Sequence, residues 1–91
     1  MKVNVKILAY KSPQRYAVWR AVLAAYEELQ AQFSALQVDV DEVKRREEIE
    51  AYTPVVIYPS LVVNESLVCI GRFPRKKEIV GWLRQALEKK P

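Results

Sequence analysis

Few side chains in this sequence belong to the types that most often carry out chemistry. The chain has no histidine and one cysteine, Cys69. Histidine is the usual acid–base group near neutral pH and a common metal ligand, and a single cysteine cannot form a disulfide within the chain. We therefore expect neither a metal ion nor another cofactor, and no catalysis by a Cys-His or Ser-His pair.

The remaining candidates for chemistry lie in the stretch KSPQR, from Lys11 to Arg15, between an apolar segment and a helix-like pattern. No histidine is available to activate the Ser12 hydroxyl as a nucleophile. A serine directly before Pro13 is typical of a helix start, because its hydroxyl accepts a hydrogen bond from a free amide of the first turn. We interpret Ser12 as the helix cap, and we leave Arg15 open between binding an anionic ligand and simple solvation.

Cys69 and the basic residues give weaker signals. Cys69 lies in a strand-like segment in which apolar side chains alternate, so we interpret it as a buried, unreactive thiol. Fifteen lysine and arginine residues against eleven acidic residues give a net charge of +4. The basic groups at 44–46 and 72–77 are more typical of solvated helix starts than of phosphate contacts, and we expect no nucleic-acid partner.

The spacing of apolar residues predicts the elements that must position these groups. Strand patterns cover residues 3–10, 35–40, 60–63 and 66–70, and helical spacing covers 12–33, 43–52 and 75–89. Asp41 is expected to cap the short second helix, and the polar pair Asn64-Glu65 to turn a hairpin. The order predicts an α/β fold, βαβαββα, with a parallel first strand pair and a four-stranded mixed sheet that helices cover on both faces.

Length and composition limit how the chain is organised. Its 91 residues, of which 51% are hydrophobic, suffice for one hydrophobic core, so we expect a single domain over residues 1–91. No apolar run approaches the roughly 18–20 residues that span a bilayer, and the first residues lack the apolar stretch of a secretory signal. We therefore expect a cytoplasmic protein with no membrane partner.

The element order and the proline spacing resemble the thioredoxin-like fold, in particular its short, single-domain thioredoxin- and glutaredoxin-like members. The stretch from Tyr58 through the hairpin to Pro74 looks like the family's cis-proline, hairpin and last-helix segment. The resemblance implies a cis peptide bond before Pro59. Pro54, in a literal Thr-Pro step, is the alternative, but that register places Pro59 inside a strand, where proline is poorly tolerated.

The departure from that family lies at its active-site motif. Family members carry Cys-Pro-x-Cys at the start of the first helix, where this chain has Ser12-Pro13-Gln14-Arg15. Thiol–disulfide exchange needs one thiolate to attack and a second thiol to resolve the mixed disulfide, and a serine does neither. The resemblance therefore implies the fold without the redox activity. A fainter similarity to the KaiB family, whose thioredoxin-like members lack the cysteine pair, gives a precedent for a domain that acts by binding partners.

Two functional hypotheses follow. The first is a non-redox binding module that takes a protein or peptide, and Lys11 and Arg15 favour an acidic one. The residues expected at its surface are Lys11, Ser12, Pro13, Arg15, Tyr58 and Pro59, with Tyr10 and Tyr16 beside them. The second is an oxidoreductase or glutathione-linked protein that relies on Cys69 or on a partner's thiol. A homodimer through the strand edge at 66–70 stays open.

Overall fold

Strand β1 (Lys2–Leu8) lies inside the sheet of the computed structural model, which describes residues 2–88. Helix α1 (Ser12–Gln30) returns the chain so that β2 (Gln37–Val43) pairs with β1 in parallel. The hairpin of β3 (Ser60–Val63) and β4 (Ser66–Cys69) joins the other side of β1, with β3 antiparallel to β1. The sheet order is β2-β1-β3-β4, which confirms the predicted four-stranded mixed sheet and its parallel first pair.

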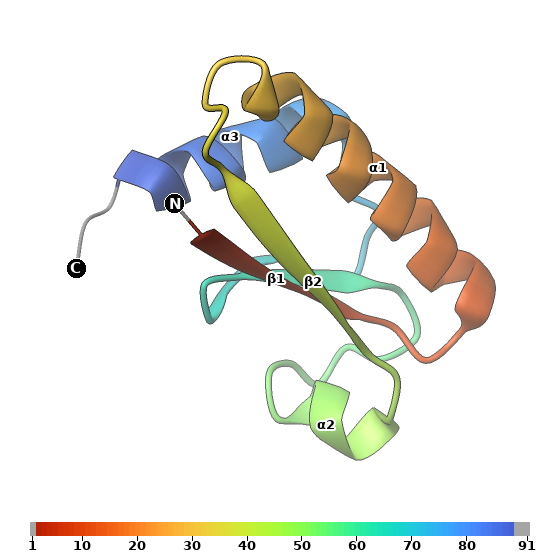
Figure 1. Cartoon of the computed structure of the whole chain (residues 1–91). Helices are drawn as coiled ribbons and strands as arrows, with labels where there is room; N and C mark the ends of the chain where they lie inside the picture. The colour runs from red at the N-terminus through yellow and green to blue at the C-terminus, as the bar shows by residue number, and fades with distance from the viewer. Residues whose placement is uncertain (1, 89–91) are drawn as a thin grey trace.

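Helices cover both faces of the sheet, but unequally (Figure 1). Helix α1 and the last helix, α3 (Lys76–Glu88), pack on one face and bury the larger hydrophobic core. The short helix α2 (Arg46–Glu50) lies on the other face, where Ile49 packs in a smaller cluster. The other buried members of that cluster are Leu8, Val56 and Val62. None of the helices within residues 2–88 is long and apolar enough to cross a membrane.

Helix α1 begins and ends differently from the prediction. Lys11 holds the capping position in an extended conformation and makes no side-chain hydrogen bond there, while Ser12 is the first helical residue. The predicted Ser12 cap is therefore wrong, because a capping side chain must stand outside the helical turn to reach the free amides. At the other end the helix stops at Gln30 instead of Phe33 and continues as a turn.

Strand β2 extends further than its alternation predicted. The pairing with β1 continues through Asp41 to Val43, which lies opposite Leu8. Asp41 was expected to cap the second helix, and that expectation is wrong because the strand ladder takes this residue instead. Helix α2 begins only at Arg46, and the side chain of its capping residue, Arg45, makes no hydrogen bond that caps the helix. The expected Lys89 at the end of the last helix lies outside the described residues.

The prolines around the entry to β3 have trans peptide bonds. No cis peptide bond occurs within residues 2–88, so the expected cis bond before Pro59 is not met, and Pro54 is trans as well. Pro59 stands one residue ahead of Ser60, the first paired residue of β3. Because the pairing of β3 begins at Ser60, the sheet requires no backbone N–H at position 59, and proline fits there. The trans form is also the favoured isomer of an X-Pro bond, by about 0.5–1 kcal/mol.

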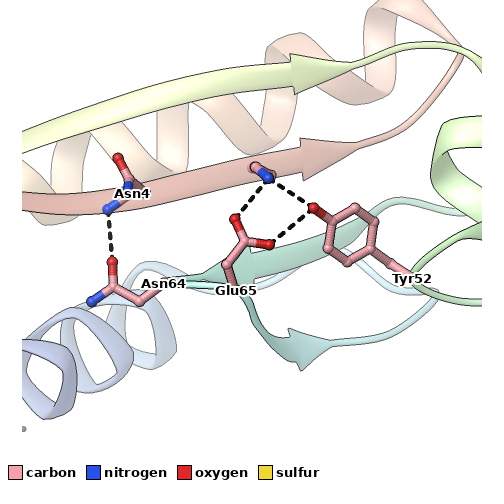
Figure 2. A network of polar contacts seen from close by, with 5 residues as sticks. Asn4, Tyr52, Asn64 and Glu65 are labelled. Atoms are coloured by element: carbon pink, nitrogen blue, oxygen red, sulfur yellow. Dashed lines mark hydrogen bonds and ion pairs between the residues drawn. The ribbon is translucent and has the colours of Figure 1, made fainter. Parts of the chain in front are cut away.

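The hairpin turn is built from two residues with positive φ. Asn64 and Glu65 have φ angles of 47° and 64°, and this left-handed pair twists a two-residue turn in the same sense as the flanking strands. Asn64 is also attached to β1, because its backbone amide donates to the Asn4 carbonyl at 2.8 Å. Its side-chain oxygen accepts the Asn4 amide at 2.9 Å (Figure 2). The predicted hairpin is confirmed, and its tip is tied to the neighbouring strand.

Candidate functional site

Three segments meet at the carboxyl end of β1. Leu8 pairs with Ser60 at the start of β3, so the chain just before β3 lies beside the chain just after β1. The side chain of Gln14 joins α1 to this segment, because its Nε2 donates to the Ile57 carbonyl oxygen at 3.0 Å. The two stretches predicted to share one surface, 12–15 and 58–59, are therefore neighbours in the structure.

The predicted site residues differ in their exposure. Lys11, Ser12 and Pro13 are exposed at the start of α1. Tyr58 is also exposed, with 55% of its surface accessible. Pro59 is buried directly ahead of β3. Because this side chain is buried, the contacts with any partner fall to its exposed neighbours, Ile57 and Tyr58.

Arg15 is already engaged within the protein. Its Nε donates to Glu42 Oε1 at 2.9 Å, and its Nη1 donates to the Ala9 carbonyl oxygen at 3.0 Å. The side chain is 14% exposed. The guanidinium thus fastens the start of α1 to the ends of β1 and β2, and Glu42 balances its charge. Arg15 is a positioning residue here and not the free cation that an anionic ligand needs.

Sequence reasoning missed Glu42 as the partner of Arg15. The position of Glu42 could have indicated this role. In a parallel pair the end of the second strand lies beside the end of the first, within reach of a side chain at the start of the helix. The prediction ended that strand at Val40, so the residue fell outside the pattern that would have placed it. The strand continues to Val43, and this brings the carboxylate to the helix start.

The start of α1 offers few free amides to an anion. The N–H groups of Gln14 and Arg15 both donate to the Lys11 carbonyl at 3.1 Å, and Pro13 has no N–H. Among the residues that the structure describes, the amide of Ser12 is the one in this turn without a backbone acceptor. The helix dipole still favours negative charge at this end. A ring of amides around a phosphate, however, cannot form on this turn.

Large apolar side chains are exposed around the carboxyl end of β1. Tyr10 follows β1, Ile57 and Tyr58 precede β3, and Ile70 follows β4 at the level of Ser60, whose hydroxyl accepts the Gly71 N–H at 3.0 Å. We call Tyr10, Ile57, Tyr58 and Ile70 the apolar rim. Their exposed fractions lie between 42% and 59%. Sequence reasoning predicted the tyrosines but not Ile57 or Ile70, because Ile57 lies outside the strands and Ile70 was expected inside the strand at 66–70.

A shallow cleft of about 240 Å³ opens on the β2 side of the helix start. Ser12, Arg15, Tyr16, Trp19 and Glu42 line it. Its walls combine one ion pair with two aromatic rings, which gives it no net charge. This cleft is separate from the segment 57–59, which does not contribute to its lining.

The single thiol is poorly placed for chemistry. Cys69 is 2% exposed at the end of β4, and its Sγ donates to the Arg72 carbonyl oxygen at 3.4 Å. Burial raises the pKa of this thiol above its usual value, so it stays protonated near neutral pH. The predicted burial of Cys69 is confirmed. Within residues 2–88, no group of three or more His, Cys, Asp or Glu side chains is arranged to hold a metal ion.

A polar cluster on the α2 face fixes the segment that leads to the rim (Figure 2). Lys6 Nζ donates to Glu65 Oε2 and to the Tyr52 hydroxyl oxygen, each at 2.7 Å, and the Tyr52 hydroxyl donates to Glu65 Oε1 at 3.1 Å. These contacts raise the pKa of Lys6 and lower that of Glu65, because each charged form is held by the other. The cluster ties the end of α2 to the hairpin, and all of its members have partners.

A second ion pair holds the loop after β4. Arg72 Nη1 and Nη2 donate to the two carboxylate oxygens of Glu78 at 2.9 and 2.6 Å. Glu78 Oε1 also accepts the Arg75 amide at 2.9 Å, which satisfies a donor at the start of α3. These bonds lower the pKa of Glu78 to about 2, and the bond from Arg72 makes the largest contribution. The pair fixes the backbone that carries Ile70 into the rim.

The thioredoxin domain family matches residues 3–84 of the chain. The matched region includes nearly all of the sheet, α1 and most of α3, and therefore the site built above. No curated protein and no solved structure matches the chain. The match covers most of the chain and agrees with the mixed sheet and its helices. This chain therefore belongs to the thioredoxin domain family.

Proposed function

We propose that this chain is a binding domain of the thioredoxin family that works without dithiol exchange and takes an extended segment of a protein partner at the apolar rim. The observation that carries the proposal is the start of α1, where Ser12 and Arg15 stand at the positions of the family's two thiols. The Arg15 side chain is locked to Glu42 and the Ala9 carbonyl. The site keeps the family's position in the fold but lacks the thiols for thiol–disulfide exchange.

The exchange reaction needs two accessible sulfur atoms. A thiolate attacks the substrate disulfide to form a mixed disulfide, and a second thiolate then attacks that bond and releases the reduced substrate. Ser12 supplies no sulfur, and a hydroxyl is not ionised near neutral pH. Cys69 is buried, with a raised pKa, so it supports neither step. The alternative of an oxidoreductase or glutathione-linked protein that uses Cys69 therefore has little support.

The rim favours apolar and aromatic side chains in the partner. Tyrosines give large, rigid contact areas with a polar tip, and such residues often dominate protein interfaces. Lys11 is exposed beside the rim and favours an acidic residue nearby. Arg15 adds little to a preference for an acidic partner, because Glu42 balances its charge. We therefore expect apolar contacts at Tyr58 and Ile57 to contribute most of the binding affinity.

Selection of peptides from a random library tests this proposal directly. Peptides that bind the wild-type chain are expected to bind Tyr58→Ala more weakly by about 1–3 kcal/mol, because truncation removes a central contact. Lys11→Glu should weaken acidic peptides in particular, and Lys77→Glu on the exposed side of α3 serves as its charge-matched control. Full affinity of the selected peptides for Tyr58→Ala would refute the site. Reduction of insulin disulfides by the chain with dithiothreitol, above the rate without protein, would refute the absence of exchange.

A further inference from the structure

Strand β2 leaves one side of the sheet open next to an apolar groove. In the sheet order β2-β1-β3-β4, β2 has β1 on one side, and no strand formed by residues 2–88 lies on the other. The groove, about 110 Å³, lies between α1 and β2 and adjoins the cleft at the helix start through Trp19, which lines both. Its walls are Trp19, Val22, Leu23, Tyr26, Val38 and Val40. This surface is distinct from the apolar rim and does not depend on the function proposed there.

The register tells which backbone groups of β2 face outward. The Ala9 amide donates to the Val43 carbonyl at 3.1 Å, so Val43 points its backbone groups toward β1. Backbone groups alternate in direction along a strand in a parallel pair. Those of Val38, Val40 and Glu42 therefore point away from β1. Three N–H and three C=O groups stand ready to pair with an added strand, as in recognition by strand addition.

The side chains along this edge have a different chemistry on each face. Val38 and Val40 point to the face of α1 and border the groove, where Trp19 and Leu23 remain 37% and 38% exposed. The alternate residues Asp39 and Asp41 point to the other face and are exposed. Asp39 pairs with Lys2 at 2.9 Å. Within residues 2–88, Asp41 takes part in no ion pair.

The acidic face argues against a second copy of this chain that pairs with β2 centred on Val40. If two β2 strands paired antiparallel about a two-fold axis at Val40, Asp39 of each chain would lie opposite Asp41 of the other. Like charges directly opposite each other on a sheet are destabilising. Asp41, which is in no ion pair within residues 2–88, would attract a strand that carries a cationic side chain opposite it, and Asp39 would contribute less because Lys2 already balances its charge.

We propose that the open edge of β2 binds an extended segment of another protein in which apolar residues alternate with lysine or arginine. The apolar side chains of that segment would enter the groove beside Trp19 and Leu23. Its basic side chains would lie on the opposite face, beside Asp39 and Asp41. Its backbone would pair with the outward groups of Val38, Val40 and Glu42.

A short capped peptide that alternates lysine and valine is the probe for this proposal, with a peptide of alternating glutamate and valine as control. In a titration of the ¹⁵N-labelled protein, the lysine peptide should shift the amide signals of Val38, Val40 and Glu42 and the indole signal of Trp19. The glutamate peptide should leave them in place. Shifts confined to residues 10–15 and 57–59, or equal affinity for the two peptides, would overturn the assignment to β2.

Variants of the edge separate charge from backbone pairing. Asp41→Lys should raise the Kd of the lysine peptide at least fivefold, whereas Glu28→Lys, whose native side chain pairs with Lys76 of α3, should leave it unchanged. Val40→Pro removes an outward N–H and should therefore abolish binding. The variant should still fold, because proline is tolerated in an edge strand where its N–H would face solvent. If Val40→Pro fails to fold, the Asp41→Lys result alone decides. An unchanged Kd in Asp41→Lys, or concentration-dependent line broadening of the free protein at β2, would overturn the proposal.

Discussion

Replacing the two glycines of this chain with alanine should change stability in opposite directions. Gly71 follows β4 with a φ of +64°, and a Cβ built there would stand 2.7 Å from Val55 Cγ1. Gly81 lies within α3, and a Cβ there would meet no atom within 4 Å. The same chemical change is therefore strained at one position and free of contacts at the other.

The expected size follows from three physical effects at Gly71. A non-glycine residue in the left-handed region costs about 1–2 kcal/mol, and the overpacking against Val55 costs about 1–3 kcal/mol. The smaller conformational freedom of alanine in the unfolded chain offsets about 0.4–1 kcal/mol. Gly71→Ala should therefore destabilise by about 1–5 kcal/mol, with a central value of about 3 kcal/mol. Gly81→Ala should stabilise by about 0.5–1 kcal/mol, because glycine is a poor helix former.

Urea denaturation followed by tryptophan fluorescence measures both variants. The midpoint should fall for Gly71→Ala and rise for Gly81→Ala at an unchanged m-value, since neither variant changes the surface exposed on unfolding. In a thermal scan the two shifts correspond to about 10–20 °C downward and about 4 °C upward for a domain of this size. Wild-type stability in Gly71→Ala would refute the reasoning, because it would mean that the loop adopts another backbone conformation or that Val55 moves aside at no cost.

Three further predictions concern buried or paired side chains. Ser60→Ala should destabilise by about 1–3 kcal/mol in urea denaturation, because the Gly71 N–H loses its acceptor, and wild-type stability would contradict this role. Cys69 should react with a maleimide slowly in native protein and rapidly in urea, and fast native labelling would contradict its burial. The pKa of Glu78 is lowered to about 2 from 4.5, so its bonds stabilise the fold above pH 4.5 and this contribution is lost as the pH falls toward 2. The stability difference between wild type and Glu78→Gln should shrink over that range, and a difference that widens on acidification would contradict the pairing with Arg72.

Local sequence patterns predicted the elements whose residues are neighbours along the chain. The apolar stripe that recurs at three and four residues in α1 predicted core positions correctly for Val18, Val22, Ala25 and Leu29. It was wrong for Ala17, Trp19 and Leu23, which also belonged to the stripe and are exposed. The polar pair Asn64-Glu65 between two apolar runs gives the hairpin turn. Such patterns work because a helix or a two-residue turn depends on residues a few positions apart. The absence of cysteine at positions 12 and 15 was likewise readable from the sequence, since it depends only on which residues stand there.

Contacts between distant residues were decided by the tertiary structure alone. The extension of β2 to Val43 depends on its pairing with β1, and this extension brings Glu42 to Arg15 and turns a candidate ligand group into a positioning residue. The loss of the expected Ser12 cap depends likewise on where the helix begins once the chain leaves β1. The exposure of Ile57 and Ile70 depends on which segments meet at the end of the sheet, and the local sequence of either segment does not predict these contacts. The sequence alone determined the order of the elements and the missing thiols, because both are local properties of the chain. Only the fold decided which side chains at the carboxyl end of β1 are free to contact a partner, because burial and pairing there involve residues that lie far apart in the chain.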